Sequence, residues 1–402
     1  MVFNIDKMNI PLRFPAGLLM LAMMGCQQKV ADPLEEAQES LDVAARQLAL
    51  SIASLGNADR NPRTAENGVV QLVRTRDWTS GFYPGCLWYL YEYTGDEKFL
   101  EAARHYTMNL EREQFNGGTH DLGFIIFNSF GNGYRLTHDS SYKEVVIQAA
   151  RTLATRFNPV VGCTRSWDHN QDKWQFPVII DNMMNLELLF WVARETDDTA
   201  MYNMAVSHAE TTMKNHYRDD HSSWHVIDYD TISGEVLHRQ THQGYSNESA
   251  WARGQCWGCY GFTMVYRETG EQKFLDHAKN IADFILHHEN MPEDLVPYWD
   301  FNAPGIPDEP RDASAAAILC SGLYELSKHL GAEGAPYKEA ADKILVSLSS
   351  GKYRAPVGEN NHFILMHSVG SKPAGSEVDV PLIYADYYFI ESCMRKLELE
   401  RD

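Results

Sequence analysis

Carboxylates at the starts of predicted helices are the residues of this chain best suited to chemistry. Asp181 opens the stretch from Ile179 to Trp191, which is apolar almost all round and therefore predicts a buried helix. Asp is a favoured residue at a helix N-terminus, because backbone N–H groups and the helix dipole stabilise negative charge there. Asp181 is also a candidate catalytic acid, since a carboxyl at the edge of an apolar core can hold a proton and donate it.

Other carboxylates stand at the starts of further predicted helices, and aromatic residues stand close to them. The carboxylates are Asp77, Asp121, Glu248, Asp312 and Asp379, and the aromatics are Trp78, Phe82, Tyr83, Trp167, Trp174, Trp251, Trp257, Tyr298 and Trp299. We expect most of the carboxylates to be helix caps. Indole faces stack on sugar rings while carboxyl groups transfer protons, so the combination predicts a carbohydrate site.

A repeated segment shows how these helices are connected. The sequence Glu92 to Leu100 recurs closely at Arg267 to Leu275 and more loosely at Arg194 to Tyr202. Each copy ends one helix, makes a short turn and begins the next helix with an aromatic residue. The repeat therefore predicts a chain of helical hairpins.

The helices before and after these turns differ in character. Those before them are apolar and rich in small residues: 81–93, 122–136, 180–195, 249–268, 313–329 and 380–396. Those after them, such as 274–288 and 337–349, are amphipathic, and 34–55 is the amphipathic helix that would complete the set. The pattern predicts an all-α protein, an (α/α)6 toroid of six helical hairpins in a single domain over 34–402. Its inner helices would begin at one rim, where the carboxylates and aromatics would meet.

The first residues are typical of an export signal. Lys7 and Arg13 precede an apolar run, 14–24, which ends at Gly25 and Cys26. The segment 21–26 resembles a bacterial lipobox, which predicts a signal over 1–25, a lipid on Cys26 and a tether over 26–33; a plain cleaved signal is the alternative. We expect a periplasmic protein, held to a membrane only through that lipid.

Composition restricts the other partners. The formal net charge is −20 and no basic stripe is present, which argues against binding of nucleic acid or long polyanions. Of the seven cysteines, Cys256 and Cys259 form a C-x-x-C without the second pair that a zinc site needs, so we expect two buried thiols. The sequence predicts a monomer with neither metal nor cofactor.

Longer motifs resemble a known family, the unsaturated glucuronyl hydrolases of glycoside hydrolase family 88. The matching segments run from Asp77 to Gly85, Thr119 to Phe124, Ile179 to Trp191, Thr241 to Tyr245, Trp251 to Gly258 and Glu377 to Tyr388. They span nearly the whole chain in the family's order.

The resemblance implies roles for particular residues. Asp181 would be the general acid and base, and Asp121 a second essential carboxylate. His225, Gln243, Arg253 and Trp257 would hold the unsaturated uronate, with Trp78, His120, Trp167 and His242 lining the site. The residues alone leave an alternative for two of these side chains: Arg253 as a structural ion-pair partner and His242 as a core histidine.

The resemblance also implies the substrate and the reaction. Family enzymes remove a 4,5-unsaturated glucuronate from the non-reducing end of di- or oligosaccharides that lyases produce. They hydrate the C4=C5 double bond. We expect glycosaminoglycan-type fragments; the alternatives are a related unsaturated rhamnogalacturonyl hydrolase acting on pectin fragments and a noncatalytic glycan-binding lipoprotein.

The segment 367–373 is a candidate determinant of substrate choice. It is polar, is interrupted by Gly370 and Pro373, and precedes the last inner helix. Ser368 and Lys372 would accept a sulfate on the neighbouring sugar; the alternative is a plain surface loop.

Overall fold

The computed structural model describes residues 31–401, of which residues 32–401 belong to one compact unit. The predicted export signal, Cys26 and most of the predicted tether lie outside the described residues. No helix that the structure describes combines the length and apolar composition needed to cross a membrane. Within 31–401, no cluster of three or more His, Cys, Asp or Glu side chains is arranged to hold a metal ion.

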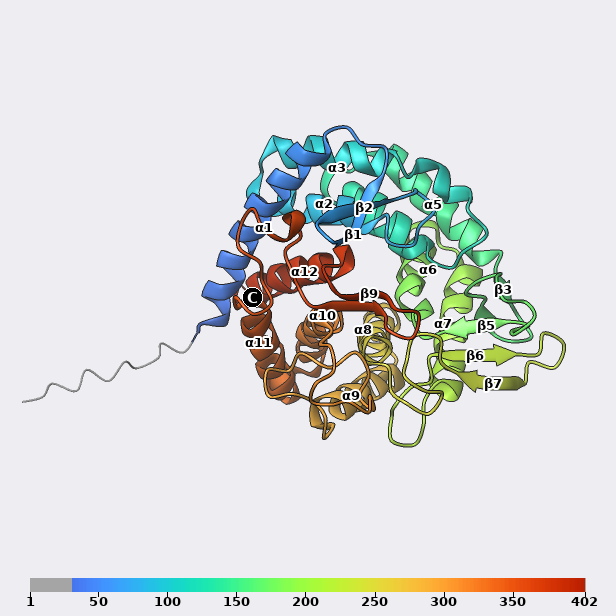
Figure 1. Ribbon diagram of the computed structural model, residues 1–402. Coiled ribbons are helices and arrows are strands. Elements are labelled where there is room, and N and C mark those ends of the chain that lie inside the picture. The colour runs from blue at the N-terminus through green and yellow to red at the C-terminus, as the bar shows by residue number, and fades with distance from the viewer. Residues whose placement is uncertain (1–30, 402) are drawn as a thin grey trace, which may run out of the picture. The chain divides into compact units, whose positions relative to one another are not determined.

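Two concentric rings of helices make up this unit (Figure 1). The inner ring contains α2 (Phe82–Thr94), η2 with α4 (Gly123–Gly131 and Asn132–Thr137), α6 (Asn182–Thr196), α8 (Ala252–Thr269), α10 (Ala313–Leu330) and α12 (Ile383–Leu399). The outer ring contains α1 (Pro33–Leu55), α3 (Glu97–Met108), α5 (Ser140–Ala154), α7 (Thr199–Asn215), α9 (Gln272–His287) and α11 (Ala335–Ser349). This arrangement confirms the predicted (α/α)6 toroid.

The repeated segment forms the turns between α2 and α3, between α6 and α7 and between α8 and α9. Gly95 and Gly270 end α2 and α8 in the left-handed conformation, with φ of 65° and 69°, which a side chain would disfavour. Their N–H groups donate to the carbonyl oxygens of Tyr91 and Tyr266. Asp96 then accepts from the N–H of Lys98 and so caps α3. The chain therefore reverses at these turns.

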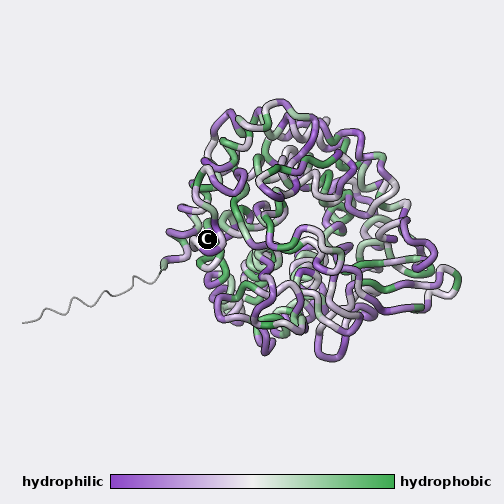
Figure 2. Tube along the Cα trace, in the orientation of Figure 1, coloured by the Kyte–Doolittle hydropathy of each residue, from purple (hydrophilic) through white to green (hydrophobic). Residues whose placement is uncertain are grey.

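Burial explains why the two rings differ in composition. In α10, residues on every face are buried, because the helix contacts α8, α11 and α12. In α9, one face is buried and the other carries charged residues. The hydropathy pattern follows this division, with apolar segments concentrated inside the ring (Figure 2).

Two features differ from the sequence prediction. The stretch 123–131 is a π-helix, η2, where an α-helix was expected. Short antiparallel strands also connect the helices: β1 (Asn61–Glu66), β2 (Val69–Val73), β3 (Phe157–Asn158), β4 (Cys163–Thr164), β5 (Pro177–Ile179), β6 (Val226–Tyr229), β7 (Val236–Gln240), β8 (Ser368–Ser371) and β9 (Ser376–Val380). The segment 367–373 thus belongs largely to a β-hairpin. Short 3-10 turns, η1 (Glu111–Phe115), η3 (Gly331–Gly334) and η4 (Asn360–His362), complete the connections.

The cysteines are where the sequence placed them. Cys256 and Cys259 are buried free thiols on α8, and the other cysteines that the structure describes are also buried and free. Burial raises the pKa of Cys256 well above its usual range, so this thiol stays protonated and unreactive.

Candidate active site

A cavity of about 720 Å³ opens where the inner helices begin. Its walls come from these helix starts, from the β1–β2 and β8–β9 hairpins and from the end of β5. Eight of the predicted site residues line it: Trp78, His120, Asp121, Trp167, Asp181, His242, Gln243 and Arg253. The tertiary structure therefore brings together most of the residues that the motifs singled out.

Asp181 occupies the N-cap position of α6, yet its side chain makes no capping hydrogen bond. The residue is 9% exposed, and its Oδ2 atom has no hydrogen-bond partner. Burial raises the pKa of Asp181 to about 6, while Arg253, a backbone hydrogen bond and Trp257 act against this rise. The geometry therefore favours the proton-donor interpretation over the helix cap.

Asp121 lies in the same cavity with a different set of partners. Its Oδ2 accepts from the hydroxyl of Thr119 at 2.8 Å, and its Oδ1 lies 3.3 Å from Nε2 of His120. Burial raises the pKa of Asp121 to about 7, the Thr119 hydrogen bond opposes the rise, and the charge of Asp181 adds to it. Burial is the largest cause of the raised pKa for both carboxyls.

His225 lies directly behind Asp181. Its Nδ1 accepts from the backbone N–H groups of His242 and Gln243, each at 3.2 Å. Burial lowers the pKa of His225 well below its usual range, so the ring is neutral and its proton is on Nε2. This N–H points to Oδ2 of Asp181 at 3.7 Å. His225 is therefore placed to orient the acid, although it does not line the cavity.

Arg253 forms a structural ion pair and also lines the cavity. Its guanidinium is 1% exposed and forms an ion pair with Asp312 at 3.1 Å, so the structural ion pair exists. The same group donates to the carbonyl oxygens of Val369 and Gly370 in β8. The Nε atom has no partner, and the side chain lines the cavity. One edge of the planar group thus remains available for a carboxylate.

Aromatic rings line two sides of the cavity. Trp78 lies 4.9 Å from the ring of Tyr384, and Trp167 lies 5.5 Å from His242. His242 is exposed, so the alternative of a core histidine is wrong. Trp257, the remaining predicted aromatic, is buried below this layer, and its Nε1 has no hydrogen-bond partner.

Two residues of the site were missed in the sequence. The hydroxyl of Tyr384 is buried without a partner, and its ring faces Arg253 at 5.3 Å. Arg63, from β1, binds Glu377 and Asp77 and lies over Trp78 at 5.9 Å. Tyr384 lies in the family segment from Glu377 to Tyr388, but that segment contains several aromatic residues and the spacing does not single out Tyr384 among them. Arg63 lies outside every motif.

Ser368 and Lys372 are not among the residues that line the cavity. Ser368 is fully buried in β8. Lys372 forms an ion pair with Glu309 and lies over the ring of Trp299, so its charge is already neutralised. The structure thus places neither side chain among the lining residues, and their role in sulfate recognition stays a prediction. Other residues of the same hairpin, Ser371, Ala374 and Ser376, line the cavity instead.

The remaining predicted carboxylates have structural surroundings. Asp312 caps α10 through the N–H groups of Ser314 and Ala315. Glu248 and Asp379 are 80% and 58% exposed in their ion pairs with Arg218 and His367. Only Asp121 and Asp181 combine a place in the cavity with a raised carboxyl pKa.

Comparisons with known proteins agree with this geometry. Residues 57–393 match the family described as Glycosyl Hydrolase Family 88. An unsaturated glucuronyl hydrolase from Formosa agariphila is 49% identical over 332 residues, which is 82% of this chain and 82% of the relative. An unsaturated chondroitin disaccharide hydrolase from Streptococcus pneumoniae is 34% identical over 90% of this chain and 92% of the relative.

Solved structures show the same fold. An unsaturated glucuronyl hydrolase specific for heparin superposes with a TM-score of 0.89 at 48% identity, covering 92% of this chain and 98% of that chain. A mutant enzyme from Streptococcus agalactiae in complex with dGlcA-GalNAc6S gives a TM-score of 0.78 at 32% identity, covering 90% and 92% of the two chains. By sequence, fold and the residues gathered in its cavity, the chain belongs to glycosyl hydrolase family 88.

Proposed function

We propose that this glycoside hydrolase removes a 4,5-unsaturated glucuronate from the non-reducing end of short, lyase-generated oligosaccharides. One observation carries the proposal. Three residues that line the cavity have a buried polar atom without a partner, namely Oδ2 of Asp181, Nε of Arg253 and the hydroxyl of Tyr384. Nε2 of His225 and Nε1 of Trp257, which lie behind the lining, are also without a partner. Because buried polar groups in proteins are nearly always hydrogen-bonded, this cluster is suited to a polar, anionic ligand.

Hydration of the double bond requires one group that gives a proton and then takes one. In the proposed reaction, Asp181 protonates C4, positive charge develops at C5 and the ring oxygen, and water adds to C5. The resulting hemiketal opens and releases the neighbouring sugar. A carboxyl whose pKa is about 6 holds its proton in weakly acidic solution and returns readily to that state.

The relatives favour glycosaminoglycan fragments over pectin fragments. Their names include chondroitin disaccharide and heparin, and one structure holds dGlcA-GalNAc6S. We therefore place the substrate among unsaturated disaccharides of this class. The noncatalytic alternative does not fit a chain that belongs to a family of hydrolases.

Turnover in heavy water tests the reaction. We expect one deuterium at C4 of the released keto-sugar, because the proton that Asp181 delivers comes from solvent. The product is examined by mass spectrometry and NMR before enolisation can exchange it. Direct attack of water at the anomeric carbon adds no deuterium at C4, so an unlabelled product would overturn hydration of the double bond.

Substrate choice is proposed to depend on Arg74 and Arg76, which follow β2. Both side chains are exposed and line the cavity, and neither forms an ion pair within residues 31–401. They stand out in a chain whose net charge is −20. Free guanidinium groups at the mouth of a uronate site suit a sulfate on the neighbouring sugar.

Replacing both with alanine tests this preference. For Arg74→Ala with Arg76→Ala, we expect kcat/KM to fall about tenfold on a sulfated unsaturated disaccharide and to change little on its unsulfated counterpart, because a charge-assisted contact is lost. Arg104→Ala, which removes an exposed arginine from the outer helix α3, is the control. Equal losses on both substrates would contradict a role in sulfate recognition.

Export and lipidation of Cys26 remain proposals. They rest on the charged and apolar pattern that precedes Cys26. We expect Cys26→Ser, expressed in a bacterium that processes lipoproteins, to move the protein from the membrane fraction to the soluble periplasm with turnover unchanged. The same fractionation for both proteins would rule out the lipid.

A further inference from the structure

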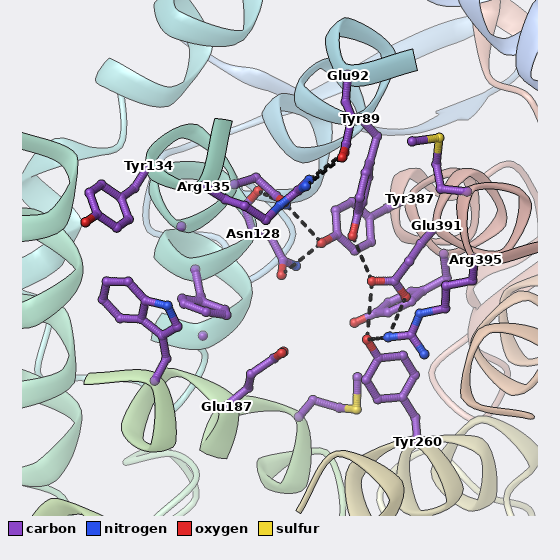
Figure 3. A pocket seen from close by; sticks show the side chains of 18 of the residues that line it. Tyr89, Glu92, Asn128, Tyr134, Arg135, Glu187, Tyr260, Tyr387, Glu391 and Arg395 are labelled. Carbon is purple, nitrogen blue, oxygen red and sulfur yellow. Dashed lines mark hydrogen bonds and ion pairs between the residues drawn. The ribbon is translucent and has the colours of Figure 1, made fainter. Parts of the chain in front are cut away.

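A second cavity lies at the opposite end of the helix ring. It has a volume of about 810 Å³, against about 720 Å³ for the active site. Its walls come from α2, η2, α4, α6, α8 and α12, and side chains from these helices surround an open space (Figure 3). A volume of this size is typical of small-molecule sites.

An aromatic layer separates the two cavities. Phe124 contacts Trp78 of the active site at 5.6 Å between ring centroids and also lines the second cavity. Trp257 bridges Phe124 and Tyr388 at 5.3 Å and 5.4 Å. No residue lines both cavities. The second cavity is therefore not an extension of the uronate site.

Charge within this cavity is balanced. Five glutamates and five arginines line it, in a protein whose net charge is −20. The ion pairs are Glu92 with Arg135, Glu268 with Arg194, Glu187 with Arg267, and Glu391 with Arg395. Because eight of these ten charged side chains are paired with one another and the two signs are equal in number, the cavity does not select strongly for either an anion or a cation. A neutral ligand fits it better.

One wall offers aromatic faces. Trp191 on α6 lies 5.8 Å from Phe127 and 5.6 Å from Tyr134, measured between ring centroids. All three side chains are only half buried, so part of each ring faces the cavity. Aromatic rings of this kind stack on the C–H faces of sugars.

The facing wall offers fixed polar groups. The hydroxyls of Tyr89 and Tyr260 donate to Oε1 of Glu391 at 2.9 Å and 3.3 Å, which leaves their oxygens able to accept (Figure 3). The hydroxyl of Tyr387 lies 3.3 Å from Oδ1 of Asn128. The Nδ2 atom of Asn128 is buried and has no partner. Asn128 belongs to the π-helix η2, a conformation often found at functional sites.

We propose that this cavity binds a neutral saccharide of one or two residues. Aromatic faces on one side, oriented hydroxyl and amide groups on the other and a balanced charge together match an uncharged polyol ring. This site is independent of the reaction proposed above, since it shares no lining residue with the active site.

Binding of cellobiose and N,N′-diacetylchitobiose to the full chain tests the proposal. We expect saturation-transfer NMR and tryptophan fluorescence to detect at least one of these neutral disaccharides. Trp191→Leu should weaken that binding about tenfold through loss of a stacking face. Phe115→Leu, at an exposed aromatic outside both cavities, should leave it unchanged.

Two further measurements distinguish the sites and verify folding. Trp191→Leu should keep normal turnover of the unsaturated disaccharide, which shows that the variant folds. Trp78→Leu in the active site should retain binding of the neutral disaccharide. The proposal would be overturned if neither disaccharide bound, or if Trp78→Leu abolished the binding and Trp191→Leu did not. Preferential binding of spermidine or sulfate would also overturn it.

Discussion

Asp181→Asn is expected to lower kcat by about 10² to 10⁴-fold while leaving the affinity for the unsaturated disaccharide nearly unchanged. The amide keeps the shape of the carboxyl, but it cannot donate a proton to C4 and then accept one from water. Single-turnover kinetics and calorimetric titration measure the two effects separately. The control is Asp197→Asn, at the C-terminal end of the same helix, which makes the same change of charge away from the site. Asn185→Asp is unsuitable as a control, because the amide oxygen of Asn185 accepts a hydrogen bond from the N–H of Phe124 in the core.

The same substitution should stabilise the fold in alkaline solution. The pKa of Asp181 rises from 3.8 to about 6 on folding, so the folded protein holds this proton more tightly than the unfolded chain does. The free energy of unfolding therefore falls as the pH rises through the folded pKa of about 6. The loss amounts to about 3 kcal/mol, since each pKa unit corresponds to about 1.4 kcal/mol. Asp181→Asn should therefore melt at a higher temperature than the native protein at pH 8 and at a similar temperature at pH 4. A lower melting temperature at pH 8 would show that Asp181 has a structural role.

Asp121→Asn is expected to lower kcat/KM by about 10²-fold through loss of substrate positioning. Asp121 is held by Thr119 and His120, so its free lone pairs have a defined direction. Asn in its place has one acceptor fewer and cannot ionise. Asp121→Glu, which keeps the carboxyl group but shifts it by one methylene, is the matched comparison.

The pH profile gives the second readout for Asp121. Activity requires protonated Asp181, so the rate should fall as the pH rises above the pKa of this residue, about 6. The pKa of Asp121 is about 7, so this carboxyl is mostly protonated and uncharged where Asp181 titrates. Asp121→Asn should therefore leave the falling limb near pH 6, and a limb that moves toward acid would show that Asp121 is ionised in the working enzyme.

Local patterns in the sequence were enough to predict the helix ring. The all-round apolar character of 313–329 reports burial between neighbouring helices, and the repeat at Glu92 to Leu100 reports a turn closed by Gly95. The apolar pattern and the repeat both involve residues that are close together in the sequence, so both can be recognised without the structure. The resemblance to the family then assigned Asp121 and Asp181 to the site, and the structure places both in one cavity.

Tertiary structure alone decided how individual side chains are used. Asp181 is an uncapped, unpartnered acid whereas Asp312 is a helix cap, although both precede apolar helices. Lys372 looks free in the sequence and is neutralised by Glu309, 63 positions away. The sequence by itself determined the ring, its turns and the set of carboxylates at its rim. Which atoms remain without partners depends on contacts between distant segments, and no local pattern records them.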